Sequence, residues 1–147
     1  MTDNTALIVK LKTLLASSYT LYLKTHNYHW NVTGPMFTTL HTLFETQYTE
    51  LALAVDEIAE RIRALGEKAP GSYSEFSALS LVEEASGDPN AEDMIRDLTA
   101  DQEIIAKLSR EVVATAGQLG DEASAGIATD RQVIHEKNAW MLRSHLE

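Results

Sequence analysis

The sequence predicts an all-α fold, a bundle of four long helices formed by one domain that spans residues 1–147. Apolar residues recur at every third or fourth position through four long stretches, which is the period of an amphipathic helix. The three prolines and seven glycines cluster between these stretches. No alternation of polar and apolar residues competes with this pattern, so we expect no β-sheet.

The first two helices are predicted over residues 4–32 and along an apolar ladder in residues 40–65. Gly34-Pro35 separates them, and proline suits the first turn of the helix that follows. Gly66 ends the second ladder, as glycine commonly does at the C-terminus of a helix.

A long connection, residues 70–89, follows the second helix. At about 20 residues it is too long for a simple hairpin, and it suggests a crossover along the length of the bundle. An amphipathic piece that includes Phe76, Leu79 and Val82 predicts a short extra helix within this crossover.

The last two helices are predicted on either side of Gly120-Asp121. Asp88-Pro89 indicates the N-cap and first residue of the third helix, which we expect to end near Gly117. The apolar stripe of the fourth helix has heptad spacing and consists of Ile127, Ile134 and Met141.

Composition excludes several classes of function. The chain has no cysteine, which excludes disulfides, thiolate metal sites, iron–sulfur clusters and cysteine nucleophiles. Its net charge is −10, no Lys/Arg-rich tail is visible at either end, and no run of 18 apolar residues occurs. We therefore expect a cytoplasmic protein with no membrane segment, and we expect DNA binding to be absent because an acidic surface repels phosphates.

A histidine and three carboxylates on the second helix indicate a metal site. At 100° per residue, His41, Glu45, Asp56 and Glu60 point to roughly 0°, 40°, 60° and 100°, so they share one side of the helix. His29, at the end of the first helix, is a further candidate. Imidazole and carboxylate together suit iron and other divalent transition metals.

Axial distance places this site between two chains. His41 and Asp56 are 15 residues apart, which is about 22 Å along a helix, too far to bind one ion. Two antiparallel copies related by a two-fold axis near residues 50–51 would bring His41 to Glu60 and Glu45 to Asp56 of the other copy. No histidine follows a glutamate by three residues, the pattern of metal centres inside a single bundle.

Two simpler interpretations fit the same residues. A buried histidine is more often a hydrogen-bonded core residue than a ligand. Asp56 and Glu60 could likewise be solvated surface carboxylates matched by Arg63. Spacing alone leaves these alternatives open.

Three linked motifs strengthen the metal interpretation. The chain carries HNYHWNVTG at 26–34, FTTLH at 37–41 and DEIAERI at 56–62. In this order and spacing they resemble the Dps-type mini-ferritins (DNA-binding proteins from starved cells), whose fold is a ferritin-like four-helix bundle. The resemblance covers the whole chain, including the long crossover and a tryptophan near the C-terminus, Trp140.

The resemblance implies a ferroxidase that oxidises Fe(II), preferably with hydrogen peroxide, and stores the Fe(III) mineral inside a shell of twelve subunits, protecting the cell from oxidative damage. It implies two-iron centres at two-fold interfaces, with His29 and His41 from one subunit and Asp56 and Glu60 from its partner. Glu45 would serve the second, weaker iron position. Trp30 is either a large core side chain or an electron donor that limits radical escape.

The resemblance also implies acid-lined pores at three-fold axes, through which iron enters. Asp121, Glu122 and Asp130 match these positions, whereas Gly126 stands where several relatives have another aspartate. In a simpler interpretation, Asp121 caps a helix and Asp130 is solvated.

Three rival interpretations remain, of which the last concerns misloading of the site and not a different function. One is a DNA-binding nucleoid protein with little ferroxidase activity, although twelve chains of charge −10 would carry about −120. Another is a scaffold bundle that has lost its iron chemistry, yet the candidate ligands are all present. Finally, Zn²⁺ could compete for the same ligands, because it binds such sites more tightly than Fe²⁺.

Overall fold

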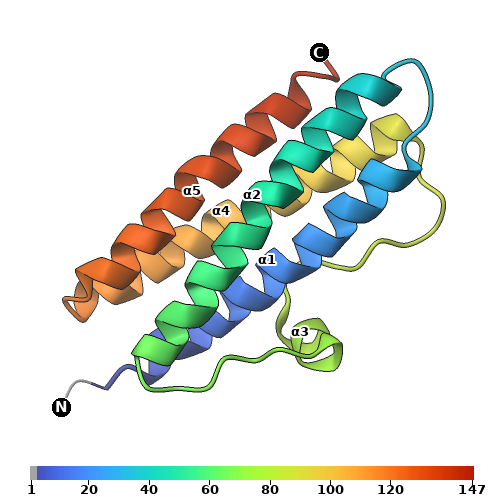
Figure 1. Cartoon of the computed structure of the whole chain (residues 1–147). Coiled ribbons are helices and arrows are strands. Elements are labelled where there is room, and N and C mark those ends of the chain that lie inside the picture. Colours follow the sequence, from blue (N-terminus) through green and yellow to red (C-terminus); the bar gives the residue numbers. More distant parts are fainter. Residues whose placement is uncertain (1–2) are drawn as a thin grey trace.

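The computed structural model describes residues 3–147 and confirms the predicted all-α architecture (Figure 1). It contains no strand within that range. Its five helices are α1 (Thr5–Asn31), α2 (Phe37–Ala64), α3 (Tyr73–Leu79), α4 (Ala91–Gln118) and α5 (Glu122–Arg143). The short helix expected in the crossover is α3, and its buried apolar residue is Phe76.

The four long helices form two antiparallel pairs, α1 with α2 and α4 with α5 (Figure 1). The segment between α2 and α4 returns along the length of the bundle, with α3 packed against α1. α2 and α4 consequently run in the same direction, as the predicted crossover requires. Gly34, with φ of +105°, makes the tight connection between α1 and α2 that brings His29 close to His41.

The predicted start of α4 is wrong by two residues. The N-cap is Asn90, whose side chain accepts a hydrogen bond of 2.9 Å from the backbone N–H of Asp93. Asp88 and Pro89 lie in the preceding loop. Asn90 has extended backbone angles (φ −79°, ψ 176°), which aim its side-chain oxygen at the first turn.

Replacing this cap should weaken the fold slightly. We expect Asn90→Ala to lower the free energy of unfolding by about 1 kcal/mol, because the amide of Asp93 loses its acceptor. Guanidinium unfolding at fixed protein concentration measures this change. Asp88→Ala serves as the control and should have almost no effect; an equal loss in both variants would contradict the assignment of the cap.

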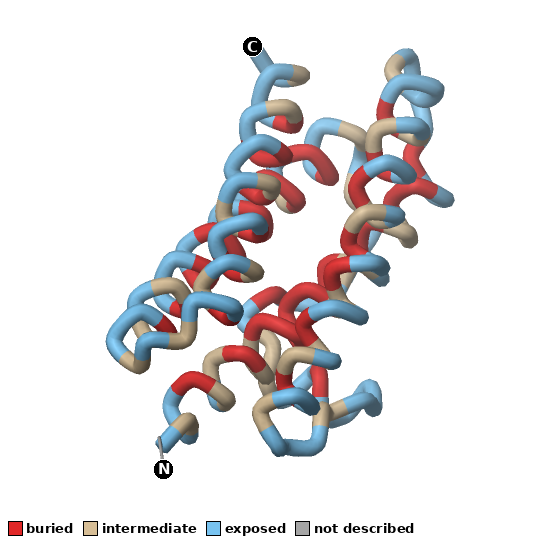
Figure 2. The backbone as a smooth tube through the Cα atoms, turned by 60° about the vertical axis from the view of Figure 1, so that its left-hand side comes forward, coloured by how far each residue is buried: buried red, intermediate tan, exposed pale blue. Residues whose placement is uncertain are grey.

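The bundle core is a continuous set of aliphatic side chains around Phe44, and the buried residues line the inner faces of the helices (Figure 2). The face of α5 differs from the expectation. Ile127, Ile134 and Met141 are only half-buried, whereas Arg131 and His135 are buried. The inner face of α5 is therefore partly polar.

By length and composition, α1 is the one helix within residues 3–147 that could cross a membrane. Its most apolar window has a mean hydropathy of 1.2, and 44% of that window is buried inside the bundle. A helix in the core of a soluble bundle can have the same length and mean hydropathy.

Candidate metal centre

His29 and His41 form a reciprocal pair at the junction of α1 and α2. The Nδ1 atom of His29 lies 2.6 Å from the backbone oxygen of His41, and the Nδ1 atom of His41 lies 2.7 Å from the backbone oxygen of His29. Their rings stack with centroids 3.7 Å apart and an angle of 14° between planes. Each histidine therefore holds the other in place.

These contacts determine which nitrogen of each ring can bind a metal. A carbonyl oxygen only accepts hydrogen bonds, so each Nδ1 must carry the proton and donate. The lone pair then resides on Nε2, in the arrangement that histidine ligands of metals usually adopt. The Nε2 atom of His29 lies 3.8 Å from Oε1 of Glu45, whose side chain is 59% exposed. These three residues supply two imidazoles and one accessible carboxylate.

Asp56 and Glu60 form a second group on the same side of α2. Both are exposed, and a hydrogen bond with Asp56 raises the pKa of the Glu60 carboxyl above its ordinary value. Two carboxyls one helical turn apart repel each other when both are ionised, and a bound cation would relieve that repulsion. Asp56 also lines an apolar groove between α1, α2 and α3.

One chain does not bring the two groups together. The 15 residues from His41 to Asp56 lie on one uninterrupted helix, so the groups are about 22 Å apart along its axis. Within residues 3–147, no set of three or more His, Asp or Glu side chains is close enough to hold a metal ion. The ligand face of α2 also lies opposite its core face, which contains Phe44, Leu51 and Ile58.

An aromatic cluster that the sequence did not predict surrounds His29. The imidazole of His26 lies 3.9 Å from the Trp30 ring and 4.2 Å from the Tyr48 ring, centroid to centroid. Tyr48 in turn lies 5.2 Å from His29. Burial, followed by the proximity of His29, lowers the pKa of His26. Trp30 is 58% exposed and is therefore not a core side chain in the single chain.

The three candidate pore acids have different environments. Asp121 caps α5 by accepting a 2.9 Å bond from the backbone N–H of Ser124, and Arg61 donates to both of its oxygens at 3.0 and 3.1 Å. Burial opposes ionisation, but the bonds from Ser124 and Arg61 outweigh it and lower the pKa of Asp121. Glu122 and Asp130 are exposed.

Two buried polar groups also escaped prediction. Lys24 binds Asp97 and Asp101 at 3.0 and 2.9 Å between α1 and α4, and Arg131 contacts Glu50 and His135 between α2 and α5. The sequence could have indicated these groups through charged or polar residues that recur with helical spacing, such as Arg131 and His135, which are one turn apart.

Comparisons with known proteins agree with this architecture. The ferritin-like domain family matches residues 8–147. DNA protection during starvation protein 2 of Bacillus anthracis is 37% identical over 143 residues, covering 97% of this chain and 98% of that protein. The crystal structure of Dps from Staphylococcus aureus has a TM-score of 0.96 and 35% identity, covering 100% of this chain and 99% of that one.

A third relative connects the fold to metal chemistry. The Dps protein from Vibrio cholerae O1, described as a member of a broad superfamily of ferritin-like diiron-carboxylate proteins, has a TM-score of 0.93 and 32% identity. The match covers 98% of this chain and 91% of that one. The expected family is confirmed: this chain belongs to the ferritin-like proteins and, among them, to the Dps-type mini-ferritins.

Proposed function

We propose that this protein is a cytoplasmic iron-sequestering ferroxidase whose catalytic sites lie between two subunits. Each site takes His29, His41 and Glu45 from one chain and Asp56 and Glu60 from a second copy. The observation that carries the proposal is the locked histidine pair, with both Nε2 lone pairs free, on the same side of α2 as the exposed carboxyl pair Asp56 and Glu60. Fe(II) is the substrate.

The exposed surface around Asp56 supports pairing with a second copy. Leu53 on α2 is 73% exposed and Tyr73 on α3 is 74% exposed, and Tyr73 lines the same groove as Asp56. We propose that these two apolar side chains and the apolar groove beside Asp56 are covered in the assembly. A two-fold axis near residues 50–51 would cover them and create two identical sites. We propose that such dimers build a twelve-subunit shell that stores the Fe(III) mineral.

The ligand types favour oxidation of iron. Carboxylate oxygens are hard anionic donors that stabilise Fe(III) relative to Fe(II). Two Fe(II) ions supply the two electrons that reduce one hydrogen peroxide, with two protons, to two water molecules, so no hydroxyl radical is released. We propose hydrogen peroxide as the preferred oxidant for this reason. Zn²⁺ fits the same nitrogen and oxygen ligands and would compete with iron.

Trp30 is placed to protect the site from incomplete reduction of peroxide. If only one Fe(II) is present, the peroxide receives one electron and lacks a second. Trp30 adjoins His29 in the sequence, and its ring lies against that of His26 at an angle of 36°. We propose that Trp30 donates the missing electron, which keeps a hydroxyl radical from escaping.

Glu122 and Asp130 are the acids proposed to attract entering Fe(II). Both are exposed in the first half of α5, where several copies in a shell would form a negatively charged ring. Asp121 acts differently, because Ser124 and Arg61 already engage both of its oxygens. In the proposed pore, Asp121 fixes the start of α5, while Glu122 and Asp130 face the entering Fe(II) ions.

Complementation between two inactive variants tests whether the site is shared. One chain carries His29→Gln/His41→Gln and the other carries Asp56→Asn/Glu60→Gln, and each assembly alone should be inactive. After the chains are unfolded, mixed and refolded together, half of the random dimers contain both chains, and each such dimer has one intact site. Peroxide-driven Fe(II) oxidation should return to about one quarter of the wild-type rate.

The control is a mixture in which both changes lie in the same chain and the other chain is wild type. Sedimentation of every mixture verifies that dimers and larger assemblies form. No recovery in correctly assembled mixed dimers would contradict a shared site, because an intrachain site cannot be restored by exchanging subunits.

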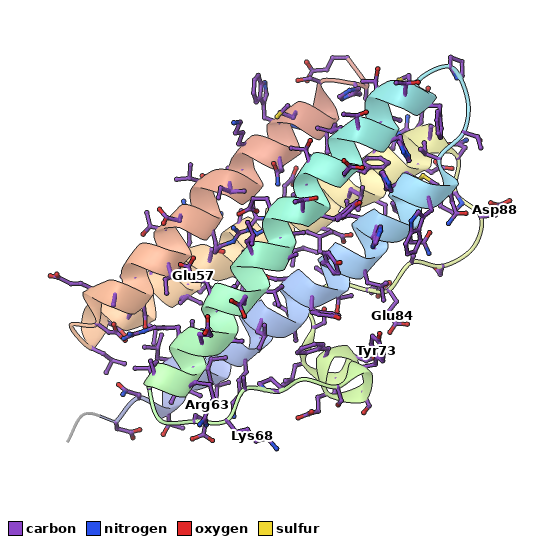
Figure 3. The ribbon with its side chains drawn as sticks, in the orientation of Figure 1. Glu57, Arg63, Lys68, Tyr73, Glu84 and Asp88 are labelled. Atoms are coloured by element: carbon purple, nitrogen blue, oxygen red, sulfur yellow. The ribbon has the colours of Figure 1, made fainter. Side chains whose placement is uncertain are left out.

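DNA binding is the second candidate function, suggested by the name of the Bacillus anthracis relative. The charge distribution opposes it. Arg63 and Lys68 lie near the C-terminal end of α2, while Glu57, Glu84 and Asp88 spread over the rest of the same view (Figure 3). A net charge of −10 per chain repels the phosphates of DNA. A mobility-shift assay at low salt should show no complex.

A further inference from the structure

A second set of potential metal ligands lies inside the bundle, away from the proposed interface. Arg131 on α5 is 4% exposed and donates to both carboxylate oxygens of Glu50 on α2, one at 3.0 Å. The same guanidinium nitrogen lies 3.0 Å from Nε2 of His135. His135 is fully buried and contacts Gln102 on α4.

The protonation of His135 follows from its two contacts. Its Nδ1 atom lies 2.6 Å from Oε1 of Gln102, an amide oxygen that accepts only, so Nδ1 carries the proton. Nε2 therefore presents its lone pair to Arg131, whose guanidinium can only donate. Burial, followed by the charge of Arg131, lowers the pKa of His135 well below its ordinary value, consistent with a neutral ring.

Arg131 thus occupies a set of atoms that would suit a divalent cation. It contacts two carboxylate oxygens and one imidazole nitrogen, and Gln102 orients that imidazole as outer partners orient histidine ligands. Four-helix bundles build metal sites in this way, from side chains on facing helices. The side chain of Glu50 is 36% exposed, so this set of ligands is open to solvent on one side.

Several buried polar atoms on α2, α4 and α5 have no hydrogen-bond partner. Both amide atoms of Gln47 are buried without a hydrogen bond, as are Nε2 of Gln102 and Nε of Arg131. Gln47 precedes Glu50 by three residues on α2 and is 2% exposed, so its oxygen is available on the inner side of the helix. These buried side chains therefore carry more hydrogen-bond donors and acceptors than the Arg131–Glu50 ion pair uses. Buried polar atoms without partners destabilise a core, so packing alone does not explain them.

We propose that Arg131 is a built-in cation that fills a divalent-metal position in the bundle and so confines metal to the surface ligands of α2. Arginine suits this task because its guanidinium stays charged and cannot vacate the ligands by losing a proton. The position of metal in this chain is then specified by one residue. The inference extends the proposed function but can be tested without any oxidation of iron.

The test replaces the cation with a ligand and uses Co(II) as the probe. In assembled protein carrying Asp56→Asn/Glu60→Gln, we expect no Co(II) within the bundle. Adding Arg131→Glu places a carboxylate one turn before His135, which with Glu50 balances the charge of a divalent ion. We expect a gain of about one Co(II) per chain over the parent, measured by equilibrium dialysis and by the visible absorption of Co(II) bound to nitrogen and oxygen.

Two control variants identify the ligands. Arg131→Lys keeps a positive charge and should bind no more Co(II) than the Asp56→Asn/Glu60→Gln parent, and Arg131→Glu/His135→Gln should lose the ion gained by Arg131→Glu. The proposal is overturned if Arg131→Glu folds without gaining Co(II), if the His135→Gln control retains it, or if the parent with Arg131 binds Co(II) in the bundle.

If the Arg131→Glu chain is unstable without metal, a folding measurement replaces the binding measurement. Refolding with and without Co(II), followed by circular dichroism, should then give helical protein only with the ion. Failure to fold in both conditions contradicts the proposal, because a filled site must stabilise the chain. The ferroxidase proposal is tested separately, in chains that keep Arg131.

Discussion

Asp56→Asn/Glu60→Gln is expected to reduce the initial rate of peroxide-driven Fe(II) oxidation by on the order of 100-fold or more. The two changes preserve side-chain shape but remove two of the three anionic donors from each shared site, leaving the two histidines and Glu45, which together favour Fe(III) much less. Because both side chains are exposed in the single chain, their loss should leave its fold intact. The measurement mixes anaerobic, Fe(II)-loaded protein with hydrogen peroxide and follows ferric absorbance.

A charge-matched variant separates ligand chemistry from a general loss of negative charge. Glu57→Gln/Glu67→Gln also removes two exposed carboxylates, one on α2 and one just after it, and should oxidise iron at nearly the wild-type rate. The wild type should consume about two Fe(II) per peroxide. Equal rates in the wild type and Asp56→Asn/Glu60→Gln, with assembly unchanged, would contradict the ferroxidase proposal.

Lys24→Met is expected to lower the free energy of unfolding by about 3–5 kcal/mol, the largest stability effect that we predict for a single substitution. The side chain of Lys24 is 3% exposed, and its ammonium binds Asp97, Asp101 and the backbone oxygen of Glu83. Methionine fills the volume but leaves the carboxylate of Asp101 in the core with no cation. Guanidinium unfolding at one fixed protein concentration measures the loss.

The pH dependence of this loss follows from Asp101. Burial raises its pKa to about 6, from 3.8, although Lys24 acts in the opposite direction. A carboxyl whose pKa is higher in the folded state binds its proton more tightly there, so it contributes stability at low pH that is lost as the pH rises. The wild type should therefore lose part of its stability between pH 4 and 6. Removing Lys24 deepens this effect, so Lys24→Met should be more destabilising at pH 8 than at pH 5.

Lys24→Met/Asp101→Asn is the matched control. Neutralising the buried carboxyl should restore much of the stability at pH 8 and remove most of the pH dependence. A Lys24→Met chain as stable as the wild type at pH 8 would show that the pair contributes little net stability. A loss that does not change with pH would show that Asp101 is not the group responsible.

The sequence by itself determined the helical periodicity, the punctuation by glycine and proline, and hence the four-helix bundle. It also determined that His41 and Asp56 are separated by 15 residues of one helix. That separation is a property of helix geometry, so the proposal of a shared site required no coordinates. The motifs at 26–34, 37–41 and 56–62 identified the family for the same reason, because their spacing is readable along the chain.

Only the tertiary structure decided how individual polar side chains are used. The histidine tautomers depend on backbone oxygens that lie 12 residues away in the chain, and the carboxylate of Asp121 is engaged by Arg61, 60 residues away. The inner face of α5 was misjudged because Ile127, Ile134 and Met141 are apolar and recur every seven residues, as core positions of a helix usually do. Arg131 could be buried in their place because Glu50 and His135, from α2 and from its own helix, satisfy its charge. Such compensation between helices is not visible in any local pattern, since it depends on which residues meet after the chain has folded.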